Sequence, residues 1–203
     1  MTTAVILTVT AYLIGSISFA VLVSRAFGLA DPRSYGSHNP GATNVLRTGK
    51  KTAALITLLG DGGKGWLAVF VAGQFAEAGA LESTKAAAAV AVVVGHVFPV
   101  FFRFEGGKGV STALGVLLSL NLYLAAGAAA TWLIMAAFFR ISSLSALVAA
   151  LFALFFALIL YNATHPYFIA VAMISALLIW RHRSNIRNLF AGTEGRLGRT
   201  KNV

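Results

Sequence analysis

The chain has 203 residues, of which 58% are hydrophobic and only 11% are charged. A soluble domain would carry about 25% charged residues, so the composition predicts an integral membrane protein and excludes an ordinary soluble enzyme. The chain contains no cysteine, which excludes disulfides, thiolate metal sites and cysteine nucleophiles. The net charge of +10 fits basic residues that flank membrane helices on the cytoplasmic side better than it fits nucleic-acid binding, so no nucleic-acid partner is expected.

Apolar segments of membrane-spanning length recur along the whole chain. They are expected at 4–26, 53–78, 86–103, 144–161 and 166–180, and a further apolar run covers 110–139. The first is expected to remain as a span, because the N-terminal sequence lacks the basic region of a signal peptide. The second is expected to be interrupted by GDGGKG at 60–65. Since no polar stretch is long enough to form a soluble domain, residues 1–203 are expected to form one all-α, membrane-embedded domain.

The run 110–139 could be one long helix or two short ones, and the distribution of basic residues decides between them. A single span would place the basic tail opposite the other basic clusters. A division near Asn121 places fourteen of the sixteen basic residues on one face, with Lys85 on the other and Lys64 inside a span. The positive-inside rule then predicts about seven transmembrane segments, some of them short, with the N-terminus outside and the C-terminus cytoplasmic. Under this topology the segments 35–47, 103–109 and 181–196 all meet the cytoplasm.

The segment YGSHNPGATNVLR, 35–47, is polar and rich in glycine. Its glycines allow close approach of the backbone to a ligand, and an arginine fork suits phosphate. The alternative is an ordinary loop of turn residues with an interfacial arginine. The groups available for binding are Gly36, Ser37, Asn39, Gly41, Thr43, Asn44 and Arg47.

A second glycine-rich segment, EGGKGVSTALG at 105–115, runs from a turn into an apolar helix. Consecutive backbone amides at a helix start, together with Lys108, can form an anion-binding site. The spacing of a Walker A loop is absent. A tight interhelical turn with an interfacial lysine is the alternative interpretation.

Five further polar positions lie in or beside apolar segments. Asp61 and Lys64 lie three residues apart within a span, where charges are costly and pair or line a polar cavity; a structural ion pair and a direct substrate role are equally open. His96 fits a hydrogen-bonding role between helices. His182 and Asn185 share a helical face at i, i+3, although a basic juxtamembrane segment that contacts anionic lipid is the alternative.

The sequence lacks several common catalytic patterns. It has no poised pair of carboxylates, no G-x-S-x-G elbow, no H-E-x-x-H and no convincing metal cluster. We therefore expect no metal and no cofactor, and the candidate site is interpreted as an anion binder at the membrane surface.

Three long stretches together resemble a known family. GSHNPGATNVLR, GHVFPVFFRFEGGKGVSTALG and HRSNIRNLFAGTE resemble the signature motifs of the PlsY family, acyl-phosphate-dependent glycerol-3-phosphate acyltransferases of the bacterial inner membrane. The resemblance covers the whole chain in order and spacing. His38 departs from it, since glycine is expected there, and Ser111 replaces a small apolar residue.

The resemblance implies transfer of a fatty acyl group from acyl-phosphate to the 1-hydroxyl of glycerol 3-phosphate, giving 1-acyl-glycerol 3-phosphate and phosphate. It implies a multi-pass enzyme, expected to be monomeric, with its site facing the cytoplasm. Its partners would be the two substrates, membrane lipids and the soluble acyltransferase that makes acyl-phosphate. Either His182 or the donor phosphate would accept the hydroxyl proton. A small transporter or flippase for a phosphorylated compound is the rival interpretation.

Site roles follow from the same resemblance. Catalytic roles are expected for Arg47, Lys108, Ser143, His182 and Asn185. These residues would also bind substrate, together with Ser37, Asn39, Gly41, Thr43, Asn44, Gly106, Gly107, Gly109 and Glu194. Supporting roles are expected for Asp61, Lys64 and His96.

Overall fold

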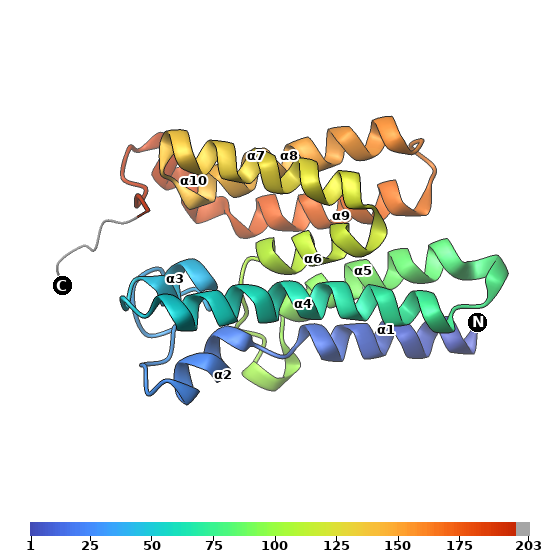
Figure 1. The fold of residues 1–203 in the computed structure, drawn as a ribbon, viewed down its shortest axis with the longest axis horizontal. Coiled ribbons are helices and arrows are strands. Elements are labelled where there is room, and N and C mark those ends of the chain that lie inside the picture. The colour runs from blue at the N-terminus through green and yellow to red at the C-terminus, as the bar shows by residue number, and fades with distance from the viewer. Residues whose placement is uncertain (198–203) are drawn as a thin grey trace.

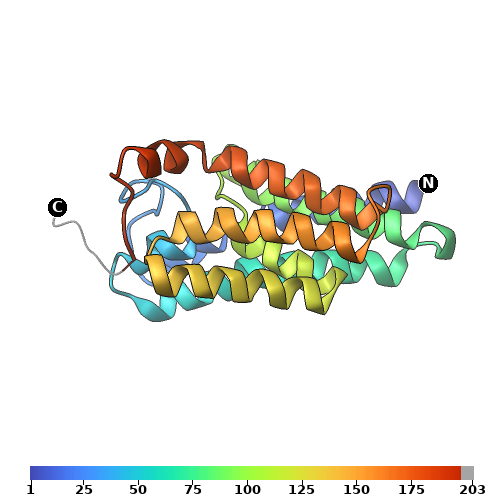
Figure 2. The same cartoon turned by 90° about the horizontal axis from the view of Figure 1, so that it is seen from above.

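The computed structural model describes residues 1–197, and this part of the chain is helical without strands. Its helices are α1 Thr2–Gly15, α2 Phe19–Ala26, α3 Ala42–Leu46, α4 Lys51–Phe75, α5 Leu81–Val97, α6 Val110–Leu120, α7 Leu122–Phe139, α8 Ser142–Leu160, α9 Pro166–Arg181 and α10 Arg183–Phe190, with 3₁₀ turns at Ala78–Ala80 and Val100–Phe102. The long helices run side by side along the long axis of the molecule (Figures 1 and 2). The N-terminus lies at one end of this bundle, and α3 and α10 lie at the other (Figure 1).

The membrane bundle predicted from the sequence is confirmed. Five segments within 1–197 are long and apolar enough to cross a bilayer: Thr2–Ala26, Lys51–Phe75, Ala78–Phe102, Leu122–Phe139 and Ser142–Leu160. The apolar helices α6 and α9 are shorter. Together they account for the seven expected apolar segments, of which two are short.

The division of the run 110–139 occurs where the distribution of basic residues placed it. Helix α6 ends at Leu120 and α7 begins at Leu122. Between them, the Asn121 carboxamide oxygen accepts hydrogen bonds from the backbone N–H groups of Tyr123 and Leu124, at 2.9 and 3.1 Å. Asn121 is therefore an N-cap, and its amide also donates to the Tyr161 hydroxyl at 3.1 Å.

The expected interruption of the second span is wrong. Helix α4 continues through GDGGKG without a break, because its glycines serve close packing instead of a turn. A Cβ on Gly65 would overlap the backbone of Thr112 in α6, and a Cβ on Gly115 of α6 would overlap the backbone of Gly62. Small residues let helix backbones approach closely in membranes, so the glycine run marks the contact between α4 and α6.

The break that the structure does contain lies in the first span, which the sequence predicted as one helix over 4–26. Helix α1 ends at Gly15 and α2 begins at Phe19. The Ile17 carbonyl lies in this break and accepts a hydrogen bond from the Lys64 ammonium at 2.6 Å. A backbone carbonyl that leaves a helix within the bilayer needs a partner, and Lys64 supplies it.

The interior consists mainly of small side chains, while large apolar ones face outward. Alanines of α1, α4 and α5 are almost completely buried, as with Ala11, Ala72 and Ala88. Tyr123 and Phe138 of α7, in contrast, are 75% and 80% exposed. This inversion of the soluble pattern fits helices packed on one another and surrounded by lipid.

Candidate active site

The start of α8 and the segment 185–194, which are distant in sequence, meet at one carboxylate. Glu194 Oε1 accepts hydrogen bonds from the Ser143 hydroxyl at 2.6 Å and from the Asn185 amide at 2.7 Å. Ser143 lies in the first turn of α8, and Asn185 lies in α10. The backbone N–H of Leu197 also donates to the Arg140 carbonyl at 2.6 Å, so the segment after α10 lies across the turn between α7 and α8. Glu194 thus holds two expected site residues together instead of presenting a free carboxylate.

Asn185 retains an unused acceptor. Its carboxamide oxygen is buried and accepts no hydrogen bond within the described residues. Buried polar atoms without partners are rare in folded proteins and often mark functional positions. Because its amide nitrogen is fixed on Glu194, this oxygen is an oriented acceptor for the hydroxyl of a ligand.

His182 lies between α9 and α10 and is 2% exposed. Its Nδ1 lies 2.7 Å from the Leu178 carbonyl oxygen. A carbonyl only accepts, so Nδ1 carries the hydrogen and Nε2 of the neutral ring is an acceptor. Burial lowers the pKa of His182 to about 4, and the positive charge of Lys108 adds to this shift. The imidazole is therefore neutral at pH 7, with Nε2 able to accept a proton.

Two cations accompany these residues. Lys108 is partly buried, and its ammonium donates no hydrogen bond to any residue of 1–197. Burial lowers the pKa of Lys108, while the Glu194 carboxylate opposes that change. Arg47 is exposed, with its Cδ beside Gly36 and its guanidinium beside Gly195. Within the described part of the chain, both cations therefore have donors available for an anion.

The glycine-rich turn before α6 is held by its neighbours. The Gly107 N–H donates to the His96 carbonyl at 3.1 Å, and a Cβ on Gly106 would overlap that same carbonyl. Gly109 has φ +86° and ends the turn as the N-cap of α6, a conformation that favours glycine. Arg181 donates to the Gly106 and Gly107 carbonyls at 2.9 and 3.2 Å. This role of Arg181 could not be predicted from the sequence, because basic residues at the end of a span are expected in any case.

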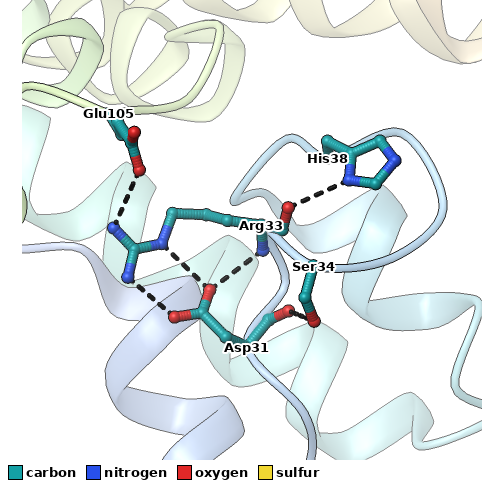
Figure 3. Close-up of polar contacts among 5 residues, drawn as sticks. All are labelled: Asp31, Arg33, Ser34, His38 and Glu105. Carbon is teal, nitrogen blue, oxygen red and sulfur yellow. Dashed lines mark hydrogen bonds and ion pairs between the residues drawn. The ribbon is translucent and has the colours of Figure 1, made fainter.

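A network of charges joins this turn to the polar segment before α3 (Figure 3). Arg33 binds Asp31 through two nitrogens, at 3.0 and 2.7 Å, and reaches Glu105 at 3.4 Å. The hydrogen bonds from Arg33 lower the pKa of Asp31. Since Glu105 begins the glycine-rich turn, Arg33 connects the two segments.

His38 has a backbone role that explains why glycine is expected there. Its φ is +53°, in the left-handed region, which costs a residue with a Cβ about 1 kcal/mol. Its ring Nδ1 donates to the Arg33 carbonyl at 3.0 Å, as Figure 3 shows. This hydrogen bond offsets part of the backbone cost.

The other expected residues of this segment divide into two groups. Ser37 and Thr43 are exposed, and Asn39 is partly buried beside Gly41. Asn44, in contrast, is 2% exposed; its amide donates to the Pro32 and Tyr35 carbonyls, and its oxygen accepts from the Ser37 N–H. Because the loop backbone uses both of its donors, Asn44 shapes the segment and has none left for a ligand.

Asp61, Lys64 and His96 lie together beneath the glycine-rich turn. The Lys64 ammonium is 2.8 Å from Asp61 Oδ1, and His96 Nδ1 lies 3.6 Å from the same oxygen, beyond hydrogen-bond distance. His96 Nε2 is the atom that a Cβ on Gly107 would strike. The three side chains therefore support the turn from below, and the geometry favours the structural interpretation of the Asp61–Lys64 pair.

Two pockets lie in the structure, one beside the site residues and one distant from them. A polar pocket of about 390 Å³ opens where the segment 33–40, the turn 104–106 and Arg181 meet. An apolar groove of about 570 Å³ lies between α1, α5 and α9, toward the end of the bundle that holds the N-terminus (Figure 1). Only the first adjoins the residues described above. Within the described residues there is no cluster of His, Asp or Glu that could hold a metal ion.

Comparisons with known proteins agree with this arrangement. A family model described as glycerol-3-phosphate acyltransferase matches residues 5–192. Curated proteins named glycerol-3-phosphate acyltransferase are 61% identical in Burkholderia pseudomallei (96% of this chain, 95% of the relative) and 60% identical in Paraburkholderia phymatum (97% and 93%).

Two solved structures are also similar over 96% of this chain. Both are crystal structures of PlsY, an integral membrane glycerol 3-phosphate acyltransferase. The glycerol 3-phosphate form is 35% identical with a TM-score of 0.89 and is covered over 96% of its length. The lysophosphatidic acid form is 34% identical with a TM-score of 0.87 and is covered over 95%. The chain is thus an integral membrane protein that belongs to the glycerol-3-phosphate acyltransferase family.

Proposed function

We propose that this protein transfers a fatty acyl group from acyl-phosphate to the 1-hydroxyl of glycerol 3-phosphate, releasing phosphate and forming 1-acyl-glycerol 3-phosphate. The observation that carries the proposal is the pairing of two oriented acceptors with free cations. Asn185 Oδ1 and His182 Nε2 accept no hydrogen bond from any residue of 1–197, and such acceptors suit glycerol hydroxyls. Lys108 and Arg47 suit the phosphate groups that both substrates carry.

The cations and the glycine-rich turn would bind phosphate. Lys108, together with the backbone N–H groups of Lys108 and Gly109 at the start of α6, provides an anion site of the helix N-terminal type. Arg47 would add a planar fork. The exposed hydroxyls of Ser37 and Thr43 would contribute further donors. Asn39 and Ser143 would orient glycerol 3-phosphate together with Asn185 and His182.

The chemistry needs little more than positioning and charge stabilisation. The 1-hydroxyl oxygen forms a bond to the acyl carbon, the bond from that carbon to the phosphate oxygen breaks, and the hydroxyl proton is transferred to a base. His182 Nε2 is an acceptor in the required tautomer. A pKa of about 4 makes it a weak base, although a bound phosphate anion raises the pKa of a neighbouring imidazole. The donor phosphate is therefore the alternative acceptor, as inferred from the sequence.

The finer cellular context belongs to the same proposal. Basic residues flank the end that carries α3 and α10, which supports a cytoplasmic site, an external N-terminus and a location in the bacterial inner membrane. The acyl chain would remain in the bilayer between helices. A soluble acyltransferase would supply the acyl-phosphate. We propose that the chain acts as one domain and as a monomer.

The test uses purified protein in detergent with glycerol 3-phosphate and palmitoyl-phosphate, and follows phosphate release and product formation. Turnover without a gradient or a second protein is expected, and it excludes a transporter or flippase without catalytic activity. Palmitoyl-CoA and palmitoyl-acyl-carrier protein, offered in parallel, should give no product. Turnover with these donors at the same rate would contradict the acyl-phosphate assignment.

A further inference from the structure

Arg181 makes two hydrogen bonds to consecutive carbonyls of a turn that lies more than seventy residues away in the chain. Its Nη2 donates to Gly106 O at 2.9 Å and its Nε donates to Gly107 O at 3.2 Å. Arg181 is the last residue of α9 and directly precedes His182. One guanidinium thus joins the helix that ends at His182 to the turn that carries Lys108.

The planarity of the peptide bond shows what these contacts fix. In a trans peptide the C=O and N–H groups point in opposite directions. The Gly106 carbonyl shares its peptide plane with the Gly107 N–H, which donates to the His96 carbonyl at 3.1 Å. This first plane is therefore held at both ends, by Arg181 and by His96.

The next peptide plane is held at one end only. The Gly107 carbonyl accepts from Arg181, and the Lys108 N–H on the other side of the same plane donates to no group of the described residues. An unused N–H beside a free lysine ammonium is a donor available to an anion. Within 1–197, the Arg181 side chain is the group that sets the direction of this N–H.

Glycine makes such a contact necessary. Gly106 and Gly107 have no side chains to restrict their backbone, and glycine loses more conformational freedom on ordering than any other residue. Fixing the backbone of a residue in one conformation is unfavourable in entropy, whereas a hydrogen bond from a charged donor is among the strongest in proteins. The two hydrogen bonds from Arg181 thus help to keep the turn in one conformation.

We propose that Arg181 is a positioning residue that holds the Gly107–Lys108 peptide so that the Lys108 N–H is directed at a substrate phosphate. Arg181 acts through the backbone of the turn, because its Nε–H and one Nη2–H donate to carbonyl oxygens of that turn. The inference rests on the proposed function, since it assumes that phosphate is the group bound at the turn.

The test compares Arg181→Lys with Arg183→Lys, which makes the same change two residues later. The Arg183 guanidinium lies 4.6 Å from the Trp180 ring centroid and donates no hydrogen bond to the turn. Arg181→Lys keeps the charge but replaces a fork by a single donor. We expect it to raise KM for a phosphate substrate about tenfold, which corresponds to about 1.4 kcal/mol, with a smaller change in kcat. Arg183→Lys should stay within about twofold of the unchanged protein.

A spectroscopic measurement separates this role from a general loss of structure. Protein labelled with ¹⁵N-lysine has six backbone lysine amides, and the Lys108 signal is assigned by its loss in Lys108→Arg. In the unchanged protein and in Arg183→Lys, inorganic phosphate should shift this signal. Arg181→Lys should require about ten times more phosphate for the same shift. If Arg181→Lys does not fold, Arg181→Gln, which can still donate to one carbonyl, replaces it in both arms.

Two outcomes would overturn the inference: an unchanged KM and phosphate titration in the Arg181 variant, or equal losses in the Arg181 and Arg183 variants. Failure of the proposed function gives a different result, namely no turnover of palmitoyl-phosphate by the unchanged protein. In that case the phosphate titration of the Lys108 amide still decides whether Arg181 directs that N–H.

Discussion

Two glycines of α4, two residues apart, allow a matched test of how helix packing sets the candidate site. A Cβ on Gly65 would lie 3.1 Å from the Thr112 carbonyl carbon in α6 and closer still to its oxygen. A Cβ on Gly63 would meet nothing within 4 Å. Gly65→Ala therefore forces α6 away from α4, whereas Gly63→Ala changes only the helix propensity.

The expected difference follows from two opposing effects. Replacing glycine by alanine within a helix contributes about 0.5–1 kcal/mol of stability, and this gain applies to both variants. Overpacking costs about 1–3 kcal/mol and applies only at Gly65, where ordinary contact would need at least 3.4 Å from backbone atoms that cannot rotate away. Gly63→Ala should therefore be the more stable variant by about 1–3 kcal/mol. At about 2–4 °C per kcal/mol for a chain of this size, the two melting temperatures should differ by several degrees.

The displacement of α6 in Gly65→Ala should also lower the catalytic activity. Helix α6 begins directly after Gly109, so a shift of α6 moves the turn that carries Lys108. Thermal unfolding in detergent and turnover of palmitoyl-phosphate are measured on both variants. We expect Gly65→Ala to lose activity well below its melting temperature and Gly63→Ala to keep it. Equal stability and equal activity of the two variants would refute the claim that this close contact positions α6.

Three further substitutions test the site itself. His182 has a lowered pKa of about 4 in the folded protein. Above pH 6.5 this shift corresponds to about 3 kcal/mol of folding stability, which is lost as the pH falls toward 4. His182→Asn should therefore show a smaller fall of melting temperature between pH 6.5 and 4. It should also remove most of kcat if His182 is the base, and a retained kcat with only a raised KM would favour the donor phosphate. Arg47→Lys should raise KM about tenfold through loss of the planar fork, with Arg187→Lys as the control; equal KM values would place Arg47 outside the site. His38→Gly should unfold at a higher temperature than His38→Ala, since alanine loses the ring hydrogen bond but keeps the left-handed backbone, at a cost of about 1 kcal/mol; the reverse order would contradict this account.

The membrane architecture could be predicted from the sequence because it depends on signals that composition carries. The length of apolar runs and the position of basic residues were enough to divide the run 110–139 at Asn121. The failure at GDGGKG has a physical cause. In a soluble protein a glycine run indicates a break in a helix, but in a membrane helix it can equally mark a close contact with another helix. The sequence does not show which helix makes that contact.

The site was predictable at the level of segments and less so at the level of side chains. The polar segments expected to share one face do meet: Arg181 bonds to the Gly106 and Gly107 carbonyls, and the Arg47 guanidinium lies beside Gly195. The role of Asn44 was missed, because a polar residue in a glycine-rich segment reads equally as a ligand donor or as a loop brace. Arg181 was missed because its partners are backbone carbonyls 74 and 75 residues away, and a carbonyl leaves no signature in the sequence.

The buried Asp61–Lys64 pair connects the membrane helices to the candidate site but takes no part in the reaction. Lys64 uses its ammonium on Asp61 and on the Ile17 carbonyl, so it has at most one donor left, and the residue is 4% exposed. Removing one partner of a buried pair leaves an uncompensated charge. Removing Lys64 would also leave the Ile17 carbonyl in the broken first span without its partner. His96, which lies between Asp61 and Gly107, extends this support to the turn. The two buried charges in α4 therefore fix the first span and the anion-binding turn relative to one another. A contact with substrate alone would not require both of these connections.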